Sequence, residues 1–127
     1  MSTPAQAHIL VVEDDAELLE ILQYVLEEAG YKVSTAPDGA AALAIAAAGK
    51  VTLILLVISM AGMSGIEVAR RLRARSETAD ILVAVHTGLG EASVRAQFPD
   101  YDLFVKKSDD SEALLAGIAT VLGEVTS

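Results

Sequence analysis

Polar side chains of three chemical types stand at or near the ends of three short apolar runs of this sequence. They are Glu13, Asp14 and Asp15 after the first run, Thr87 after the second, and Lys106 and Lys107 after the third. Clustered carboxylates favour a hard cation such as Mg²⁺. A hydroxyl and an ammonium group suit the oxygens of a phosphoryl group. If the three runs end at one edge of a sheet, these residues predict a site for a cation and a phosphoryl group.

Taken singly, each of these groups also has a purely structural interpretation. Asp14 or Asp15 could cap the helix that follows the first run. A lone threonine after a strand is more often a turn residue. A pair of lysines usually lies on the solvated surface. Only the joint placement of the residues at three strand ends favours a functional site.

The run Val51–Val57 is almost wholly apolar, which predicts a central strand covered on both faces, as in a parallel sheet. For the polar residues discussed above to form one site, the other apolar runs must form strands in the same sheet as this one. The predicted strands are 8–12, 31–35, 51–57, 81–85 and 103–105. Helical patterns alternate with them, at about 18–29, 40–48, 66–75, 91–97 and 114–122. This alternation predicts an α/β fold, a doubly wound parallel sheet of five strands in the order 2-1-3-4-5.

Length and composition predict one domain over residues 8–123, with a tail at 1–7 and another at 124–127. The chain has 127 residues, of which 53% are hydrophobic, and no cysteine. The net charge of −9 disfavours binding to nucleic acid or to anionic membranes. No apolar run reaches about 18 residues, and residues 1–7 lack the pattern of a signal peptide. A cytoplasmic location is therefore expected.

Val57 ends the central strand, where parallel sheets of this kind place their active sites. The small residues that follow form a loop, and Ser64 is a plausible cap for a helix starting near Ile66. Valine has no nucleophilic oxygen and no atom that binds a metal. The end of the central strand therefore offers no chemistry of its own.

Four segments of the chain resemble the receiver domain of two-component response regulators, and the resemblance runs from His8 to Leu122. The segments are ILVVEDD at Ile9–Asp15, LILLVISMAGMSG at Leu53–Gly65, VHTG at Val85–Gly88 and DLFVKKSDDSEALL at Asp102–Leu115. The resemblance implies the flavodoxin-like fold in its CheY-like form. It also implies a signalling module that is not an enzyme.

The resemblance implies a role for several of the residues introduced above. Glu13 and Asp14, with the backbone carbonyl of Ser59, would hold Mg²⁺. Thr87 and Lys107 would face the phosphoryl oxygens, with Lys106 as the alternative to Lys107. Phe104 falls at the aromatic switch position of the family.

The chain departs from the family pattern at four positions: the phosphoacceptor aspartate falls on Val57, a loop proline on Ala61, an acidic or amide residue on Ser64, and the proline after the lysine on Ser108. Losing the acceptor carboxylate predicts that Mg²⁺ binding is weak. The Lys107–Ser108 peptide bond is expected to be trans, because a cis bond before a residue other than proline costs about 2.5–4 kcal/mol. His86 is expected to be a packed or partly exposed residue and not a catalyst.

Two functional hypotheses remain open at this point. The chain is either a receiver-like module that signals without its own phosphorylation, or an ordinary receiver in which Val57 is a variant or engineered residue. A flavin or nucleotide binder is disfavoured because EDDAE follows the first strand in place of a glycine-rich phosphate loop. The expected partner is a protein, namely a histidine kinase, a phosphotransfer protein or an output protein, and a homodimer stays an option. The expected contact face consists of the helix at 91–97, the fifth strand and the last helix.

Overall fold

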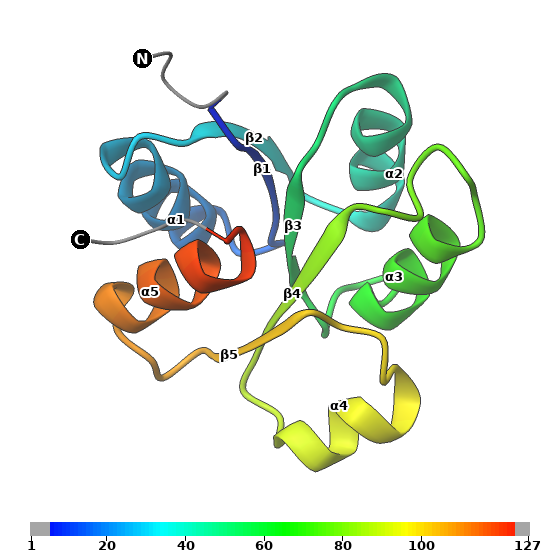
Figure 1. The fold of residues 1–127 in the computed structure, drawn as a ribbon. Coiled ribbons are helices and arrows are strands. Elements are labelled where there is room, and N and C mark those ends of the chain that lie inside the picture. The colour runs from blue at the N-terminus through cyan, green and yellow to red at the C-terminus, as the bar shows by residue number, and fades with distance from the viewer. Residues whose placement is uncertain (1–5, 124–127) are drawn as a thin grey trace.

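The computed structural model of the protein describes residues 6–123, and these form a five-stranded sheet between two layers of helices (Figure 1). All strand pairs are parallel, and the order is β2-β1-β3-β4-β5. The strands are β1 (His8–Val12), β2 (Lys32–Ala36), β3 (Leu53–Val57), β4 (Leu82–Thr87) and β5 (Leu103–Lys106). The helices are α1 (Ala16–Glu28), α2 (Gly39–Ala48), α3 (Gly65–Arg73), α4 (Glu91–Gln97) and α5 (Ser111–Val121). The predicted fold and strand order are confirmed.

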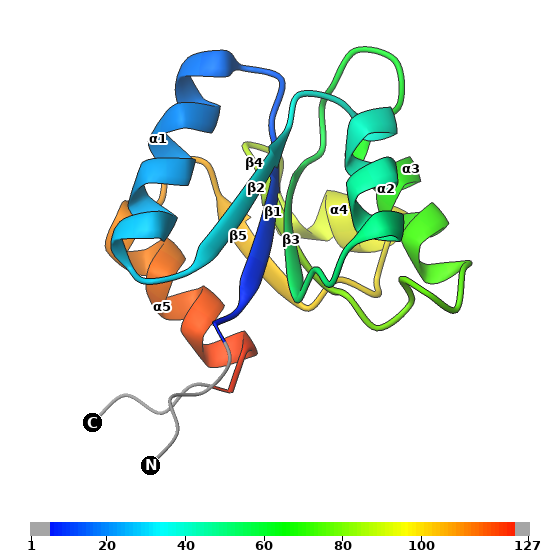
Figure 2. The same ribbon diagram turned by 90° about the horizontal axis from the view of Figure 1, so that it is seen from above.

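The helices lie on both faces of the sheet. Figure 2 shows α1 and α5 on one face, and α2, α3 and α4 on the other. Because side chains alternate along a strand, each strand supplies one set of residues to each face. The central strand β3 is the clearest case, since all five of its residues are buried. Its apolar run therefore folds as predicted, covered on both faces.

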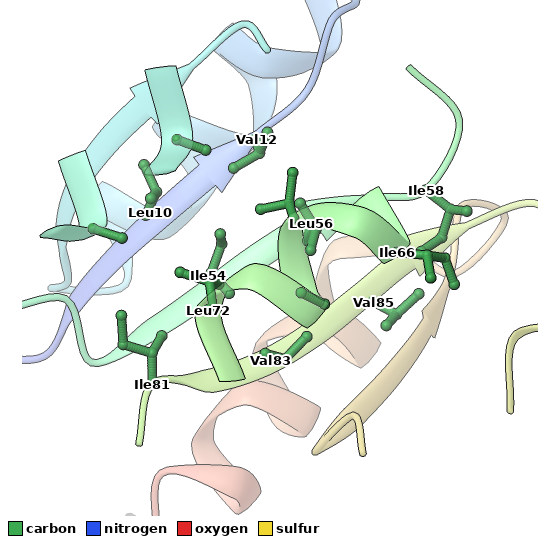
Figure 3. Close-up of a cluster of buried hydrophobic side chains, with 14 of the residues drawn as sticks. Leu10, Val12, Ile54, Leu56, Ile58, Ile66, Leu72, Ile81, Val83 and Val85 are labelled. Carbon is green, nitrogen blue, oxygen red and sulfur yellow. The ribbon is translucent and has the colours of Figure 1, made fainter. Parts of the chain in front are cut away.

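Two hydrophobic clusters fill the spaces between the sheet and its helices. Ile66 and Leu72 of α3 pack against the α2–α4 face of the sheet (Figure 3). That face presents Leu10, Val12, Ile54, Leu56, Val83 and Val85. The α1–α5 face presents Ile9, Val11, Leu53, Leu55, Ala84 and Val105 to leucines and an isoleucine of α1 and α5. The two clusters account for the high hydrophobic content of a chain of this length.

The strand boundaries differ from the predicted ones by one or two residues. β3 begins at Leu53, and the exposed Thr52 before it donates its backbone N–H to the His8 carbonyl at 2.8 Å. β4 continues to Thr87, so His86 and Thr87 belong to the strand and not to the following loop. The predicted tails at 1–7 and 124–127 lie largely outside the described residues.

Polar side chains cap the starts of helices α1, α2, α3 and α5. The side chains of Asp15, Asp38, Ser64 and Asp110 accept hydrogen bonds from backbone N–H groups of the first turn. The cap predicted at Ser64 is confirmed, with its hydroxyl 3.2 Å from the N–H of Glu67. Helix α4 begins after Gly90 without a side-chain cap.

Candidate functional site

Glu13 lies at the carboxyl edge of the sheet, directly after β1, and its side chain is only 1% exposed. Its backbone N–H donates to the Ala36 carbonyl at 3.2 Å, which fixes it against the end of β2. Its Oε2 accepts a hydrogen bond from the Asp15 N–H at 3.2 Å. Its Oε1 is buried and accepts no hydrogen bond from the described residues. A buried carboxylate of this kind needs a counter-charge.

Lys107 supplies that counter-charge. Its Nζ lies 3.2 Å from Glu13 Oε1, and its side chain is 35% exposed. The contact is an ion pair without an aligned hydrogen bond. Lys106 is the last residue of β5 and is exposed, and its backbone N–H donates to Asp109 at 3.2 Å. Of the two lysines, Lys107 is therefore the one that reaches Glu13.

The ion pair spans the ends of two other strands. Glu13 follows β1 and Lys107 follows β5, and β3 and β4 lie between those strands in the sheet. The alternation along each strand puts Val57 and His86 on the α1–α5 face. Val57 is the register partner of His86 and is 2% exposed. The apolar side chain of Val57 therefore ends a strand that lies between the strands of the two ion-pair partners.

Asp14 and Asp15 have different surroundings. Asp15 caps α1, because its Oδ1 accepts from the N–H groups of Glu17 at 3.0 Å and Leu18 at 3.3 Å. Asp14 is exposed, and no hydrogen bond or ion pair to its side chain is found among residues 6–123. Asp15 is therefore the residue that caps the helix. Of the three carboxylates, only that of Asp14 is both exposed to solvent and without a hydrogen bond or ion pair in the described part of the chain.

Thr87 is buried at the end of β4. Its hydroxyl accepts a hydrogen bond from the Leu89 N–H at 3.0 Å, which closes the turn after the strand. Its carbonyl accepts from the Lys107 N–H at 2.9 Å, which holds the start of the β5–α5 loop beside β4. Thr87 is therefore both a turn residue and a neighbour of Lys107. The described residues contain no cis peptide bond, so the trans form predicted for Lys107–Ser108 is confirmed.

His86 is a packed residue, as expected, and is 6% exposed. Burial, together with the smaller effect of the charge of Lys107, lowers its pKa from the ordinary 6.5 to about 4. The carboxylate of Asp109 acts in the opposite direction and is the smaller effect. The imidazole is therefore neutral at pH 7. Its position beside Val57 was not predicted, although the alternation from Ala84 would have indicated it.

Phe104 is half-buried on β5, on the α4 side of the sheet. Its ring centroid lies 6.1 Å from that of Tyr101 in a tilted arrangement. The Tyr101 hydroxyl donates to Glu91 of α4, and Arg95 donates to the same hydroxyl at 2.9 Å. This group connects the predicted switch residue to α4. Sequence reasoning missed Tyr101, for which spacing gave no signal.

The residues at this edge do not fit a well-formed Mg²⁺ site. No group of three or more His, Cys, Asp or Glu side chains within residues 6–123 is placed to hold a metal ion. Glu13 already contacts Lys107, Asp15 caps α1, and Asp14 is the one remaining carboxylate of the three that follow β1. Mg²⁺ requires close to ideal octahedral geometry and is bound through carboxylates at such sites.

The family model for the response regulator receiver domain matches residues 9–119. The chain belongs to this family. The resemblance drawn from the four sequence segments is therefore confirmed.

Similarity to curated proteins supports this family assignment. The uncharacterized transcriptional regulatory protein YkoG of Bacillus subtilis is 36% identical over 118 residues, which cover 92% of this chain and 51% of YkoG. The chain spans about half the length of the curated relatives it matches.

Two solved structures show the same receiver fold. The chemotaxis protein CheY4 of Vibrio cholerae is 26% identical with a TM-score of 0.87, over 92% of this chain and 99% of CheY4. The response regulator TrrA of Thermotoga maritima, solved in complex with Mg²⁺ and BeF, is 30% identical with a TM-score of 0.83, over 91% of this chain and 99% of TrrA. In the described part of this receiver domain, no helix has the length and apolar character needed to cross a membrane.

Proposed function

We propose that this receiver domain signals without being phosphorylated at its own acceptor position and acts by binding a protein partner. One observation carries the proposal. The residue at the end of β3 is Val57, which is 2% exposed and has no polar atom in its side chain. It stands where the receiver family has its phosphoacceptor aspartate.

The chemistry of phosphorylation explains why this residue is decisive. A carboxylate oxygen of the receiver forms a bond to phosphorus, while the bond from phosphorus to the donor breaks and the donor leaves with the electron pair. Positioning and charge stabilisation supply most of the rate in phosphoryl transfer, but the attacking oxygen is still required. Val57 offers no such atom. The neighbouring His86, although neutral, is almost fully buried.

The proposed partner is a histidine kinase, a phosphotransfer protein or an output protein, and a second copy of this chain is the other option. The proposed contact face consists of α4, β5 and α5. Phe104 and Tyr101 support this choice, because they connect β5 to α4 through Glu91. In this proposal the domain is not an enzyme, Mg²⁺ binds only weakly, and the domain does not itself bind nucleic acid. The predicted domain limits of 8–123 and the cytoplasmic location remain predictions.

A second function is supported by three polar residues that remain at the carboxyl edge of the sheet. Glu13, Thr87 and Lys107 stand at the family positions for the metal and the phosphoryl oxygens, and Lys107 approaches Glu13. In this alternative the chain is an ordinary receiver in which Val57 is a substitution that blocks phosphorylation. The two functions differ in whether restoring a carboxylate restores the chemistry.

The test is to incubate the chain and its Val57→Asp variant with Mg²⁺ and acetyl phosphate, and to measure intact mass before and after acid treatment. The unchanged chain should take up no acid-labile phosphate. A stoichiometric adduct on Asp14 or Asp15 would overturn the proposal. Uptake of phosphate by Val57→Asp would favour the alternative. This uptake is expected to be only partial, because Ser108 leaves Lys107 imperfectly aimed and a misplacement of about 1 Å can cost ~10²-fold in rate. No uptake by the variant would rule the alternative out.

A further inference from the structure

The buried carboxylate of Glu13 is the least compensated polar group in the described residues. It is 1% exposed, and its Oε1 is the only buried side-chain oxygen or nitrogen in residues 6–123 without a hydrogen bond. Taking an ionised carboxylate out of water is costly unless a positive charge accompanies it. The identity of that positive charge therefore determines what else can bind at this edge.

Lys107 is the only basic side chain within ion-pair distance of Glu13 in the part of the chain that the structure describes. Lys106 is exposed at the end of β5 and forms no ion pair among those residues. His86 lies beside Val57 but is held neutral by its burial and by the charge of Lys107. Asp14 and Asp15 are exposed, and Asp15 is engaged at the start of α1.

We propose that the Lys107 ammonium group is the resident counter-ion of Glu13 and that it excludes divalent cations from this edge of the sheet. Because Val57 has an apolar side chain, the ends of β3 and β4 carry no second carboxylate that could compete with Glu13 for the ion pair with Lys107. The Glu13 oxygen that would otherwise be open to a metal ion is thereby paired with a charge of the chain itself.

A divalent cation could reach Glu13 Oε1 only by displacing Lys107 or by lying next to it. Displacement would leave the ammonium without its partner, and close approach would bring two positive charges together in a partly buried site. The remaining carboxylate, Asp14, is solvated and offers the metal no enclosed site. The proposal does not rest on the absence of phosphorylation, and it concerns binding alone.

The test compares Lys107→Met with Lys106→Met as a matched control, since both variants lose one lysine charge from the same segment. Thermal melts are recorded in MgCl₂ and in NaCl of equal ionic strength, and Mg²⁺ binding is measured by calorimetry. The unchanged chain and Lys106→Met should show no stabilisation specific to Mg²⁺. Lys107→Met should be less stable without metal, should recover with Mg²⁺, and should bind Mg²⁺ about ten-fold more tightly or better, because the competing charge is gone.

Two results would overturn the proposal. One is Mg²⁺ binding by the unchanged chain that is as tight as binding by Lys107→Met. The other is a folded Lys107→Met variant that gains no Mg²⁺ affinity.

If Lys107→Met does not fold, the unchanged chain still decides the question by NMR with Mn²⁺. Selective broadening of the Asp14, Asp15 and Ser59 amide signals would contradict exclusion, and broadening confined to other acidic surfaces would support it. This outcome is independent of phosphate uptake by Val57→Asp, so failure of one proposal is distinguishable from failure of the other.

Discussion

Gly65 packs so closely on the end of β3 that a β-carbon at this position would lie 2.0 Å from the carbonyl oxygen of Val57. The Gly65 N–H also donates to the carbonyl of Ile58 at 2.8 Å. The first turn of α3 is therefore seated directly against the backbone that presents Val57. This contact explains why a glycine follows the Ser64 cap, and it fixes where residue 57 lies.

We predict that Gly65→Ala lowers the free energy of unfolding by at least about 2 kcal/mol, because the methyl group meets backbone that cannot move without shifting β3 or α3. Gly88→Ala is the matched control, since Gly88 also follows a strand but a β-carbon there meets nothing within 4 Å. Its effect should stay within about 0.5 kcal/mol. Urea unfolding of both variants measures the difference, and equal stability of the two would contradict the packing argument.

The stability of the domain should fall between pH 7 and pH 4 because of His86. The folded protein holds the pKa of His86 at about 4, against 6.5 in its ordinary state. Between these values the unfolded chain binds the proton and the folded chain does not, so the free energy of unfolding decreases as the pH falls. The full contribution is on the order of 3 kcal/mol.

Replacing His86 by leucine should remove most of this pH dependence, as measured by urea unfolding at several pH values. A smaller slope should remain, because burial and the charge of Lys32 also lower the pKa of His8. A slope in His86→Leu equal to that of the unchanged chain would show that His86 does not titrate as the structure indicates.

Arg73 connects three parts of the fold through one guanidinium group. It donates to the carbonyls of Ala79 at 3.0 Å, Ile81 at 2.6 Å and Asp100 at 3.1 Å, and to Asp102 Oδ2 at 2.9 Å. Arg73→Lys should lower the free energy of unfolding by about 1.5–3 kcal/mol, because an ammonium cannot reproduce the planar fork and leaves some of these four acceptors, among them the part-buried carbonyls of Ala79 and Ile81, without their donor.

Arg75→Lys is the control for this prediction, because Arg75 pairs with Glu77 on the surface at 3.6 Å with both side chains largely exposed. Exposed pairs contribute little, about 0–1 kcal/mol. Thermal and urea unfolding measure both variants. A loss in Arg73→Lys no larger than in Arg75→Lys would mean that the guanidinium contacts contribute little to stability.

Helix α4 should open sooner than α1 in native-state hydrogen exchange. Only Val94 is buried within α4, and Gly90 provides no side-chain cap at its start. Helix α1 buries Leu22 and Leu26 and begins with the Asp15 cap. Fewer buried contacts and a weaker start lower the free energy of local opening. Protection of Glu91–Gln97 equal to or stronger than that of α1 would contradict this expectation.

The sequence was sufficient to predict the sheet, because the strands β1, β3 and β4 are mostly apolar and buried and the strands are separated by recognisable helices. It also predicted that Glu13 and Lys107 approach one edge. It could not predict that they form an ion pair over Val57, since the reach of two long side chains across β3 and β4 depends on their rotamers. Helical periodicity alone would place Arg73 on the outer face of α3, whereas its long side chain folds back onto backbone carbonyls.

The two edge strands of the sheet determine how copies of this domain can meet in concentrated solution. Within residues 6–123, β2 and β5 each have a neighbouring strand on one side only, so they carry backbone groups that another strand could pair with. β5 has only four residues and ends at Lys106, and β2 begins at Lys32. Short edges with lysines resist joining into a continuous intermolecular sheet. Fibre-like growth through strand addition is therefore disfavoured, and contacts of this domain with itself or with others are expected to use side chains of a face such as α4, β5 and α5 and not backbone pairing at an edge strand.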